Sequence, residues 1–394
     1  MARSVGTYRQ IRVGGENVRA FVPYPLPPEN PPLRMEGPLE ARHTAALAAL
    51  SRLNVAGAMV PSPEWFLYGF VRKEAVISSQ IEGTQATLMD ALTYEATHEA
   101  ERPAEVAEVC NYVDALAHAR RELARANAVR LDTRLLCAAH ARLMRGARGL
   151  AARPGSVRTA QNWVGGATPA LASFVPPPPE HVPAALARLE RWIHADDPLP
   201  PLVRTGLAHV QFETIHPFLD GNGRIGRLLI ALLMEHWGLL SLPLLYLSLG
   251  FRRRRQEYYA RLAAVRTHGD WEGWTAFYLE CVREAADDGL DAAQRLFTVI
   301  GRDRRTLLGR PDATVTALRL CDRLPEHPIV TLAAATQLLD TTKPTAAKAI
   351  EVLRRAGILR ETTGRRRNRA YAYDAYLKVL SEDTATGPHH PTSG

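Results

Sequence analysis

The stretch HPFLDGNGRIGR, residues 216–227, carries most of the recognisable chemistry of this 394-residue chain. It places an imidazole, a carboxylate, a run of small residues and two arginines within about three helical turns. His216 could act as a base, because the pKa of imidazole lies nearest to neutrality. Asp220 suits Mg²⁺, which prefers one or two carboxylates together with phosphate oxygens. We therefore interpret the stretch as a site for nucleotide phosphates, built between two helices.

The same stretch predicts how phosphate groups are held. Gly221 and Gly223 tolerate positive φ, so the backbone N–H groups around Asn222 can turn inward as an anion nest at a helix N-terminus. Arg224 and Arg227 are three residues apart and share one face of that helix, where planar guanidinium groups can bind two phosphates. A plain turn with solvated arginines is the alternative, but this order of residue types is rare in turns.

The stretch resembles the signature of the Fic family (filamentation induced by cAMP), HxFx[D/E]GN[G/K]RxxR, and meets every fixed position. Most Fic proteins transfer AMP from Mg-ATP to a Ser, Thr or Tyr hydroxyl of a target protein. The resemblance implies a mostly α-helical Fic bundle in which His216 deprotonates the hydroxyl and Asp220 binds Mg²⁺. Glycine at position 223 favours AMP transfer over phosphoryl transfer. The resemblance also implies that these residues contact the nucleotide: Pro217, Phe218, Leu219, Asp220, Gly221, Asn222, Gly223, Arg224 and Arg227.

A second segment, EAVISSQIEGTQATL at 74–88, fits the inhibitory motif [S/T]xxxE[G/N] of regulated Fic proteins through Ser78, Glu82 and Gly83. Ser78 and Glu82 are four residues apart and share a helix face, and Gly83 offers an end to that helix. The resemblance implies that Glu82 reaches the nucleotide site, pairs with Arg227 and keeps the γ-phosphate from a productive position. Without the other motif, Glu82 would be interpreted as a solvent-facing helix residue.

Composition constrains the class of protein. The chain is 46% hydrophobic and 23% charged, as in an ordinary globular protein, and its length predicts two or three domains. We find no run of about 18 apolar residues and no basic leader, and therefore expect a cytoplasmic protein without membrane association. The four cysteines lack metal-ligand spacing, which predicts reduced, structural thiols.

Charge and aromatic patterns add three predictions. The formal net charge is +8, and arginines cluster at 252–255 and 365–369. We interpret the cluster at 252–255 as a solvated or target-facing patch. Tyr258 and Tyr259 follow it, and the resemblance to Fic proteins places Tyr259 near the nucleotide. A role for these tyrosines in the core is the alternative.

The pattern of apolar periods, prolines and glycines predicts the domain order. Residues 155–168 are expected to form a β-hairpin flap, against which a target segment pairs by β-augmentation. Five residues match that element in character, namely Val157, Arg158, Gln161, Asn162 and Trp163. A surface hairpin without a role is the alternative. The predicted units are a proline-rich arm (1–35) and helical region with the inhibitory helix over 1–100, a Fic core over 101–286, a linking helix over 287–311, a winged helix-turn-helix over 312–380 and a disordered tail over 381–394.

The C-terminal unit is predicted from two helices joined by a tight turn and two β-like stretches around Gly364. Thr345, Lys348 and Arg354 are expected on or near the exposed face of the second helix, with arginines 365–367 at the wing tip. Such a surface attracts phosphate. Because winged helices also dock proteins, DNA and a protein both stay open as its partner.

These observations predict an autoinhibited protein adenylyltransferase that uses ATP and Mg²⁺, modifies a target hydroxyl and also itself, and forms a homodimer as relatives do. Three alternatives stay open. The site could transfer another nucleotide or phosphoryl group, or remove AMP. The chain could be a DNA-binding regulator whose Fic core senses nucleotide, or a partner-binding module with an inactive site.

Overall fold

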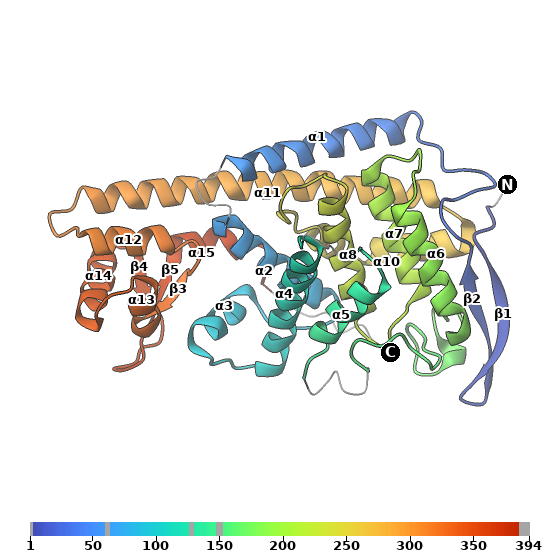
Figure 1. Cartoon of the computed structure of the whole chain (residues 1–394), viewed down its shortest axis with the longest axis horizontal. Helices are drawn as coiled ribbons and strands as arrows, with labels where there is room; N and C mark the ends of the chain where they lie inside the picture. Colours follow the sequence, from blue (N-terminus) through green and yellow to red (C-terminus); the bar gives the residue numbers. More distant parts are fainter. Residues whose placement is uncertain (1–2, 60–63, 126–129, 147–152, 386–394) are drawn as a thin grey trace.

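The computed structural model describes residues 3–59, 64–125, 130–146 and 153–385. It is mostly helical, as predicted, with two small antiparallel sheets (Figure 1). Its main helices up to residue 308 are α1 (Pro38–Ala58), α2 (Glu64–Ile81), α3 (Leu88–Thr97), α4 (Pro103–Leu123), α5 (Thr133–Leu143), α6 (Val182–His194), α7 (Pro201–Ile215), α8 (Asn222–His236), α9 (Ser248–Arg253), α10 (Arg255–His268) and α11 (Trp271–Leu308).

The helices α7 and α8 form the centre of the bundle. All residues of α7 from Leu202 to Ile215 are buried except Glu213, and most of α8 is buried as well. A helix that is apolar all round must lie inside the protein, and α4, α5, α6 and α10 surround this pair (Figure 1). The stretch 216–221, which carries the predicted chemistry, is the short connection between these two helices and is therefore held on rigid elements.

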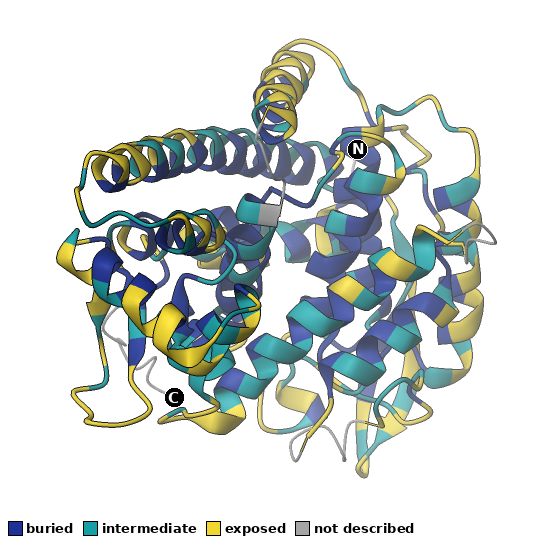
Figure 2. Cartoon of the chain, turned by 60° about the vertical axis from the view of Figure 1, so that its left-hand side comes forward, coloured by how far each residue is buried: buried dark blue, intermediate teal, exposed yellow. Residues whose placement is uncertain are grey.

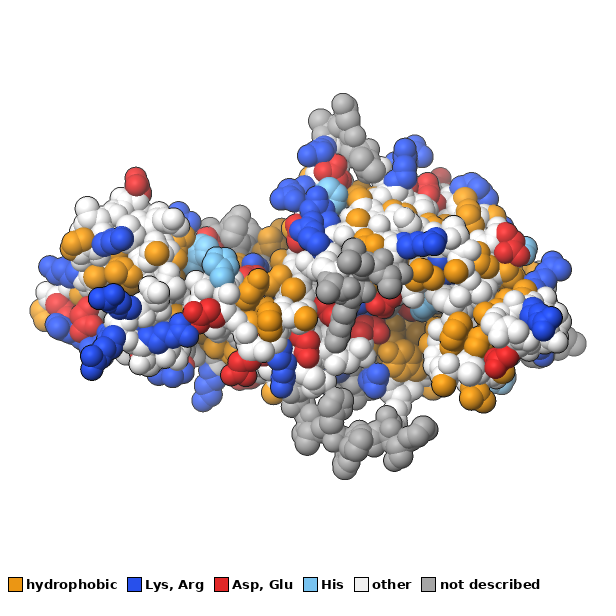
Figure 3. All heavy atoms as spheres, turned by 90° about the horizontal axis from the view of Figure 1, so that it is seen from below, with side chains coloured by type: hydrophobic (Ala, Val, Ile, Leu, Met, Phe, Trp, Pro, Cys, Tyr) orange, Lys and Arg blue, Asp and Glu red, His pale blue; other side chains and the backbone are white. Residues whose placement is uncertain are grey.

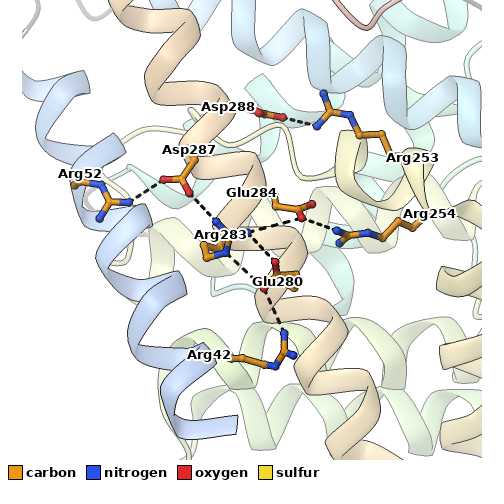
Figure 4. Close-up of polar contacts among 9 residues, drawn as sticks. All are labelled: Arg42, Arg52, Arg253, Arg254, Glu280, Arg283, Glu284, Asp287 and Asp288. Carbon is orange, nitrogen blue, oxygen red and sulfur yellow. Dashed lines mark hydrogen bonds and ion pairs between the residues drawn. The ribbon is translucent and has the colours of Figure 1, made fainter. Parts of the chain in front are cut away.

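The longest element, α11, runs along one side of the molecule with α1 beside it (Figure 1). Leu50 and Leu53 are among the residues of α1 that are buried, and the Leu53 side chain lies 3.3 Å from where a Cβ would stand on Gly289. Outside this apolar contact, Arg42 and Arg52 of α1 reach carboxylates of α11 (Figure 4). The predicted boundary between core and linking helix, at 286, falls within this single helix.

The arginines at 252–255 are not a solvated patch, so that prediction is wrong. Arg253 pairs with Asp288 at 2.6 Å and with Asp383 at 3.0 Å, and Arg254 pairs with Glu284 (Figure 4). Arg252 donates to Gln80, and the Arg255 guanidinium lies over the Tyr259 ring at 5.5 Å. The run follows α9, which packs against the acidic side of α11, and one stretch of sequence cannot reveal partners that distant.

The expected N-terminal arm begins with a hairpin. Strands β1 (Gly6–Val13) and β2 (Glu16–Pro23) pair antiparallel, with Val13 opposite Glu16. Gly14 and Gly15 between them both have positive φ, at 58° and 91°, as a two-residue hairpin turn requires. The Gly-Gly pair was the available signal, but the prolines that follow it led to the prediction of an extended arm.

The predicted hairpin over 155–168 is absent. In the part of this region that the structure describes, the β-pairing is a single bridge between Val164 and Phe174, with the short helix η2 (Pro169–Leu171) between them. Gly165 and Gly166 both adopt positive φ, and the prolines nearby cannot donate to a ladder. The segment 155–164 is instead an irregular strap over the connection 216–221.

A separate unit follows α11, and we call residues 312–380 the winged unit. Its elements are α12 (Val315–Arg323), β3 (Ile329–Thr331), α13 (Leu332–Leu338), α14 (Lys343–Arg355), β4 (Leu359–Glu361), β5 (Ala370–Tyr373) and α15 (Asp374–Leu380). The strands form one antiparallel sheet in the order β3-β5-β4. This is the helix-turn-helix and sheet expected for a winged helix, and the loop 362–369 between β4 and β5 is its wing.

The predicted disordered tail begins later than expected. Residues 381–384 form a turn after α15, and Thr384 is buried. Residues 386–394 lie outside the described residues. Burial colours show exposed residues on the outward faces of the helices and at the wing, with a buried interior between the helices (Figure 2). Within the described ranges, no helix combines the length and apolar character needed to cross a lipid bilayer.

Candidate active site

His216 is presented at the end of α7 in a form suited to accept a proton. It closes the helix in the left-handed region, with φ of 49°. Its Nδ1 lies 3.3 Å from the backbone carbonyl oxygen of Glu213. A carbonyl oxygen only accepts hydrogen bonds, so the proton sits on Nδ1 and Nε2 keeps its lone pair. Burial lowers the pKa of His216 to about 4, and the ring is therefore neutral near pH 7.

The connection from His216 to α8 is closed by Asn222. The Phe218 N–H donates to Asn222 Oδ1 at 2.8 Å, and Asn222 Nδ2 donates to the Phe218 carbonyl at 2.8 Å. Asn222 is thus a buried clamp, and its side chain does not reach outward as a ligand. Gly221 turns the chain with φ of 79° into the first turn of α8, and its N–H donates to Asp220 Oδ1 at 2.6 Å. Pro217, Phe218 and Leu219 form the clamped loop.

Two residues that hold this loop were not singled out for that role. The His140 ring of α5 stacks on Phe218 with ring centroids 3.9 Å apart, and His140 Nε2 lies 3.0 Å from the Asp220 carbonyl oxygen. Its Nδ1 accepts the Gly155 N–H at 3.0 Å. Arg158, predicted as part of a flap, donates from Nε to the His216 carbonyl at 2.8 Å. A lone histidine on a helix carries no sequence signal for such a role.

The residues of the two predicted motifs meet in space. Arg227 Nη2 lies 2.6 Å from Glu82 Oε1, and Arg227 Nε donates to Ser78 Oγ at 2.8 Å. Glu82 follows the last turn of α2, and Gly83 takes φ of 100° as the chain leaves the helix. Burial opposes ionisation of Glu82, but the ion pair with Arg227 outweighs it, so the pKa of Glu82 lies below its ordinary value.

Arg224 begins on the same turn of α8 and binds other partners. Its Nη1 donates to Glu108 Oε2 of α4 at 3.2 Å, and its Nη2 lies 3.8 Å from Asp220 Oδ1. Both arginines are buried at the base of the site. Two guanidinium groups and the free N–H groups of a helix N-terminus therefore converge at the start of α8.

A cavity of about 120 Å³ opens beside His216. Glu82 lies in its wall, and a Cβ placed on Gly223 would collide with Glu82 Oε1. The Glu82 carboxylate therefore sits at the N-terminus of α8, where an anion is stabilised most. Pockets for nucleotide-sized ligands measure roughly 300–1,000 Å³, so the cavity beside Glu82 is too small for one.

The tyrosine pair divides between the core and the site. Tyr258 is buried and its hydroxyl lies 2.8 Å from His209 Nε2, as the alternative predicted. Tyr259 is 39% exposed and lines the cavity, as do Glu213 and Arg266, which sequence reasoning did not single out. Burial raises the pKa of Glu213 to about 7. The cavity thus has titratable groups on several sides.

Among the described residues, no cluster of three or more His, Cys, Asp or Glu side chains forms a ready metal site. Asp220 offers one carboxylate with a side chain 61% exposed beside the α8 N-terminus. Mg²⁺ completes its shell with water and phosphate oxygens, so one carboxylate beside a phosphate site fits that ion. The four cysteines are all free thiols, as predicted.

Comparison with known proteins places these features in a family context. Residues 41–121 match the model of the Fic/DOC family N-terminal region, and residues 130–234 match that of the Fic/DOC family. The chain is 34% identical over 91 residues to a probable protein adenylyltransferase of Aquifex aeolicus, which is 23% of this chain and 26% of that protein. It is 32% identical over 135 residues to protein adenylyltransferase Fic of Drosophila yakuba, covering 34% and 24% respectively. The matches thus span about a quarter of each curated relative.

Solved structures share the fold. A Fic family protein from Desulfovibrio desulfuricans superposes with a TM-score of 0.55 at 22% identity, covering 86% of this chain and 97% of that one. A Fic domain containing signaling protein from Bacteroides thetaiotaomicron gives 0.51 at 18% identity, covering 64% and 97%. At these identities the likeness establishes the fold.

Proposed function

Because the chain belongs to the Fic/DOC family, we propose that it is a protein adenylyltransferase, which transfers AMP from ATP to a hydroxyl group of a target protein. One observation carries the proposal. The unprotonated Nε2 of His216 and the phosphate-binding groups at the start of α8 border the same cavity. A base beside a phosphate site is what nucleotidyl transfer to a hydroxyl requires.

The proposed reaction follows from this placement. The target hydroxyl oxygen bonds to the α-phosphorus while the bond from that phosphorus to the oxygen bridging to the β-phosphate breaks, and pyrophosphate leaves. His216 Nε2 takes the hydroxyl proton. Arg224, Arg227 and the N–H groups of α8 hold the phosphate charge in place. Asp220 would bind Mg²⁺, which neutralises phosphate charge. The target segment would approach His216 beside the strap, residues 155–164.

The proposal extends to regulation by Glu82. Arg227 cannot hold a phosphate while its Nη2 is engaged by Glu82 at 2.6 Å. The carboxylate also occupies the α8 N-terminus, so the phosphates of ATP would have to displace it. Glu82 would thus keep activity low. Modification of the chain by itself and a homodimer belong to the same proposal, because released activity needs a hydroxyl within reach.

The test is transfer of label from [α-³²P]ATP with Mg²⁺, with [γ-³²P]ATP to detect phosphoryl transfer. We expect Glu82→Gly to raise α-label incorporation about tenfold or more, because a charge-assisted hydrogen bond contributes roughly 1.5–3 kcal/mol. His216→Ala in that background should lower it by about 10²–10⁴-fold, the contribution of a general base. Glu29→Gly and His194→Ala are matched controls outside the site. Equal labelling of Glu82→Gly and the double variant would refute the proposal.

The same assay addresses the enzymatic alternatives. Labelled CTP, GTP and UTP test the choice of nucleotide, and incubation of labelled protein without ATP tests removal of AMP. Label on the purified chain alone would report self-modification, and sedimentation at several concentrations would report a dimer. Nucleotide binding without transfer by Glu82→Gly would favour a sensor over an enzyme.

A further inference from the structure

The winged unit presents an excess of positive charge. Lys343 and Lys348 are exposed on α14, and Arg366, Arg367 and Arg369 are exposed in the wing. Viewed from below, Lys and Arg side chains gather at the end of the molecule formed by this unit (Figure 3). In a winged helix, the second helix of the helix-turn-helix and the wing are the parts that approach nucleic acid.

Most acidic side chains near this surface already have partners. Glu351 of α14 pairs with Arg354 at 2.8 Å and with Arg355 at 2.9 Å. Glu361 accepts N–H groups at the start of the wing. Asp340, in the turn between α13 and α14, offsets one positive charge. The five exposed cations therefore exceed the nearby carboxylates, which gives the surface the sign that a phosphate backbone requires.

The wing is docked against the element that follows the inhibitory motif. Arg365 pairs with Glu99 at 2.8 Å, just beyond the end of α3. A groove of about 1,140 Å³ separates the two units, with the wing, α13 and Lys343 on one wall and α3 with Glu95 and His98 on the other. A duplex lying on the wing and the start of α14 would have to enter this groove, and it cannot do so while Glu99 holds the wing.

The docked groove is linked to Glu82 through the chain. Six residues, 82–87, separate α2 from α3, so a displacement of α3 acts directly on the end of α2. Within this connection the Glu82 N–H donates to the Ser79 carbonyl at 3.0 Å. Glu82 is therefore the first residue of the segment that joins the inhibitory helix to the docking surface of the wing.

The winged unit also holds α2 along its length. The Tyr376 hydroxyl of α15 donates to the Trp65 carbonyl at 3.0 Å, and Leu380 lies 2.8 Å from where a Cβ would stand on Gly69. After α15, the Thr384 carbonyl accepts from Gln80 Nε2 at 2.9 Å. The last contact is two residues before Glu82. Movement of the winged unit therefore cannot leave α2 undisturbed.

We propose that the winged unit binds double-stranded DNA through α14 and the wing, and that binding weakens its docking on α3 and α2 and so releases Glu82 from Arg227. DNA phosphates compete with Glu99 for the wing, and linkage makes this competition reciprocal: whatever loosens the docking also strengthens DNA binding. The part of the proposal that concerns AMP transfer rests on the proposed function, whereas the part that concerns binding does not.

Binding is tested by fluorescence anisotropy of a labelled 24-base-pair DNA duplex of mixed sequence. We expect the double variant Arg366→Gln/Arg367→Gln to bind about tenfold or more weakly at low salt and to reduce the slope of affinity against salt by roughly two phosphate contacts. Arg121→Gln/Arg134→Gln removes the same charge from exposed positions on α4 and α5. Equal affinities of the two double variants would overturn the assigned surface. Equal competition by poly-glutamate would overturn DNA as the partner and indicate an acidic protein.

Docking is tested by Glu99→Gln, which frees the wing without touching its cations. We expect this variant to bind the duplex about fivefold or more tightly. We also expect the duplex to speed amide exchange in the last turn of α2, measured on His216→Ala protein so that no turnover intervenes. Unchanged affinity of Glu99→Gln, or unchanged exchange in α2, would overturn the coupling.

AMP transfer supplies the final readout. The duplex should raise wild-type labelling about fivefold or more and should have no further effect on Glu82→Gly, in which there is nothing left to release. If the duplex binds and wild-type labelling stays constant, the coupling is wrong. If Glu82→Gly itself does not label, the proposed function fails, and the anisotropy and exchange results still decide the DNA proposal.

Discussion

Two histidines of the site are kept neutral and oriented by the backbone. Each lies against groups that can only donate or only accept, so the position of its proton is fixed. The Glu213 carbonyl places the proton of His216 on Nδ1, and the Gly155 N–H places that of His140 on Nε2, from which it reaches the Asp220 carbonyl. Burial lowers the pKa of each ring to about 4, so both roles persist above about pH 5.

His140 is therefore expected to position Asp220. His140→Phe keeps the stacking on Phe218 but leaves the Asp220 carbonyl and the Gly155 N–H without a partner. Loss of such a supporting contact lowers metal affinity or activity about 10–100-fold. In the Glu82→Gly background, we expect the Mg²⁺ requirement for AMP transfer to rise.

The measurements are the Mg²⁺ dependence of labelling and Mn²⁺ binding followed by electron paramagnetic resonance with a non-hydrolysable ATP analogue. His194→Phe is the matched control, because His194 also bonds a backbone carbonyl, that of Leu131, away from the site. An unchanged metal dependence in His140→Phe would show that the stacking alone holds the loop.

At the scale of elements, the sequence predicted what local patterns encode. The buried helices on either side of 216–221 follow from their apolar residues, and the pairing of Glu82 with Arg227 was implied by two motifs. The failures have a common cause. The arginines at 252–255 find carboxylates of α11, and the strap is held by His140 and the 216–221 connection, all distant in sequence. Partners of this kind leave no periodic signal in either segment.

The contact between α2 and α9 predicts a pH-dependent stability. Glu74 is buried and accepts from the Ser248 N–H at 3.1 Å, and burial raises its pKa from 4.5 to about 7. The folded state therefore binds a proton that the unfolded state releases between pH 4.5 and 7. Stability from this group is lost as pH rises through that window, by up to about 3 kcal/mol.

Glu74→Gln should remove this loss, because the amide oxygen still accepts from Ser248 and never ionises. The measurement is the free energy of unfolding in urea at pH 5 and pH 8, in which the variant should lose less stability than wild type. Part of the slope will persist, because the pKa of Glu213 is raised in the same direction. Glu36→Gln, at an exposed position, is the control. Equal slopes for wild type and Glu74→Gln would contradict the argument.

The contact between α1 and α11 allows apolar and ionic contributions to be compared. Leu53 is fully packed, whereas Arg283 lies in a partly exposed network with Glu280, Glu284 and Asp287 (Figure 4). Leu53→Ala should cost about 2–5 kcal/mol and Arg283→Ala less than about 1 kcal/mol. Urea unfolding at low and high salt measures both. An Arg283→Ala cost equal to that of Leu53→Ala would show that the ion pairs, and not apolar packing, hold α1.

At the scale of the molecule, one buried apolar cluster extends from Leu26 to Leu380 and includes residues of the bundle and of the winged unit. The two units share α11 and meet again where α15 packs on α2. A continuous core predicts that the units unfold together, although multi-domain chains commonly do not. This is also the condition for the proposed coupling, since a signal passes between units only if their contact is part of the folded structure.

Leu320 of α12 provides the test, because it is fully buried within the winged unit. Leu320→Ala should lower the stability of that unit by about 2–5 kcal/mol. All six tryptophans lie before residue 275, so their fluorescence reports the bundle alone. If the units unfold together, the urea midpoint by tryptophan fluorescence falls by the same amount as the midpoint by far-ultraviolet circular dichroism. Val315→Ala, exposed on the same helix, should leave both unchanged. An early dichroism phase with an unshifted fluorescence midpoint would show that the winged unit unfolds alone, and its contact with α2 would then be too weak to transmit DNA binding to Glu82.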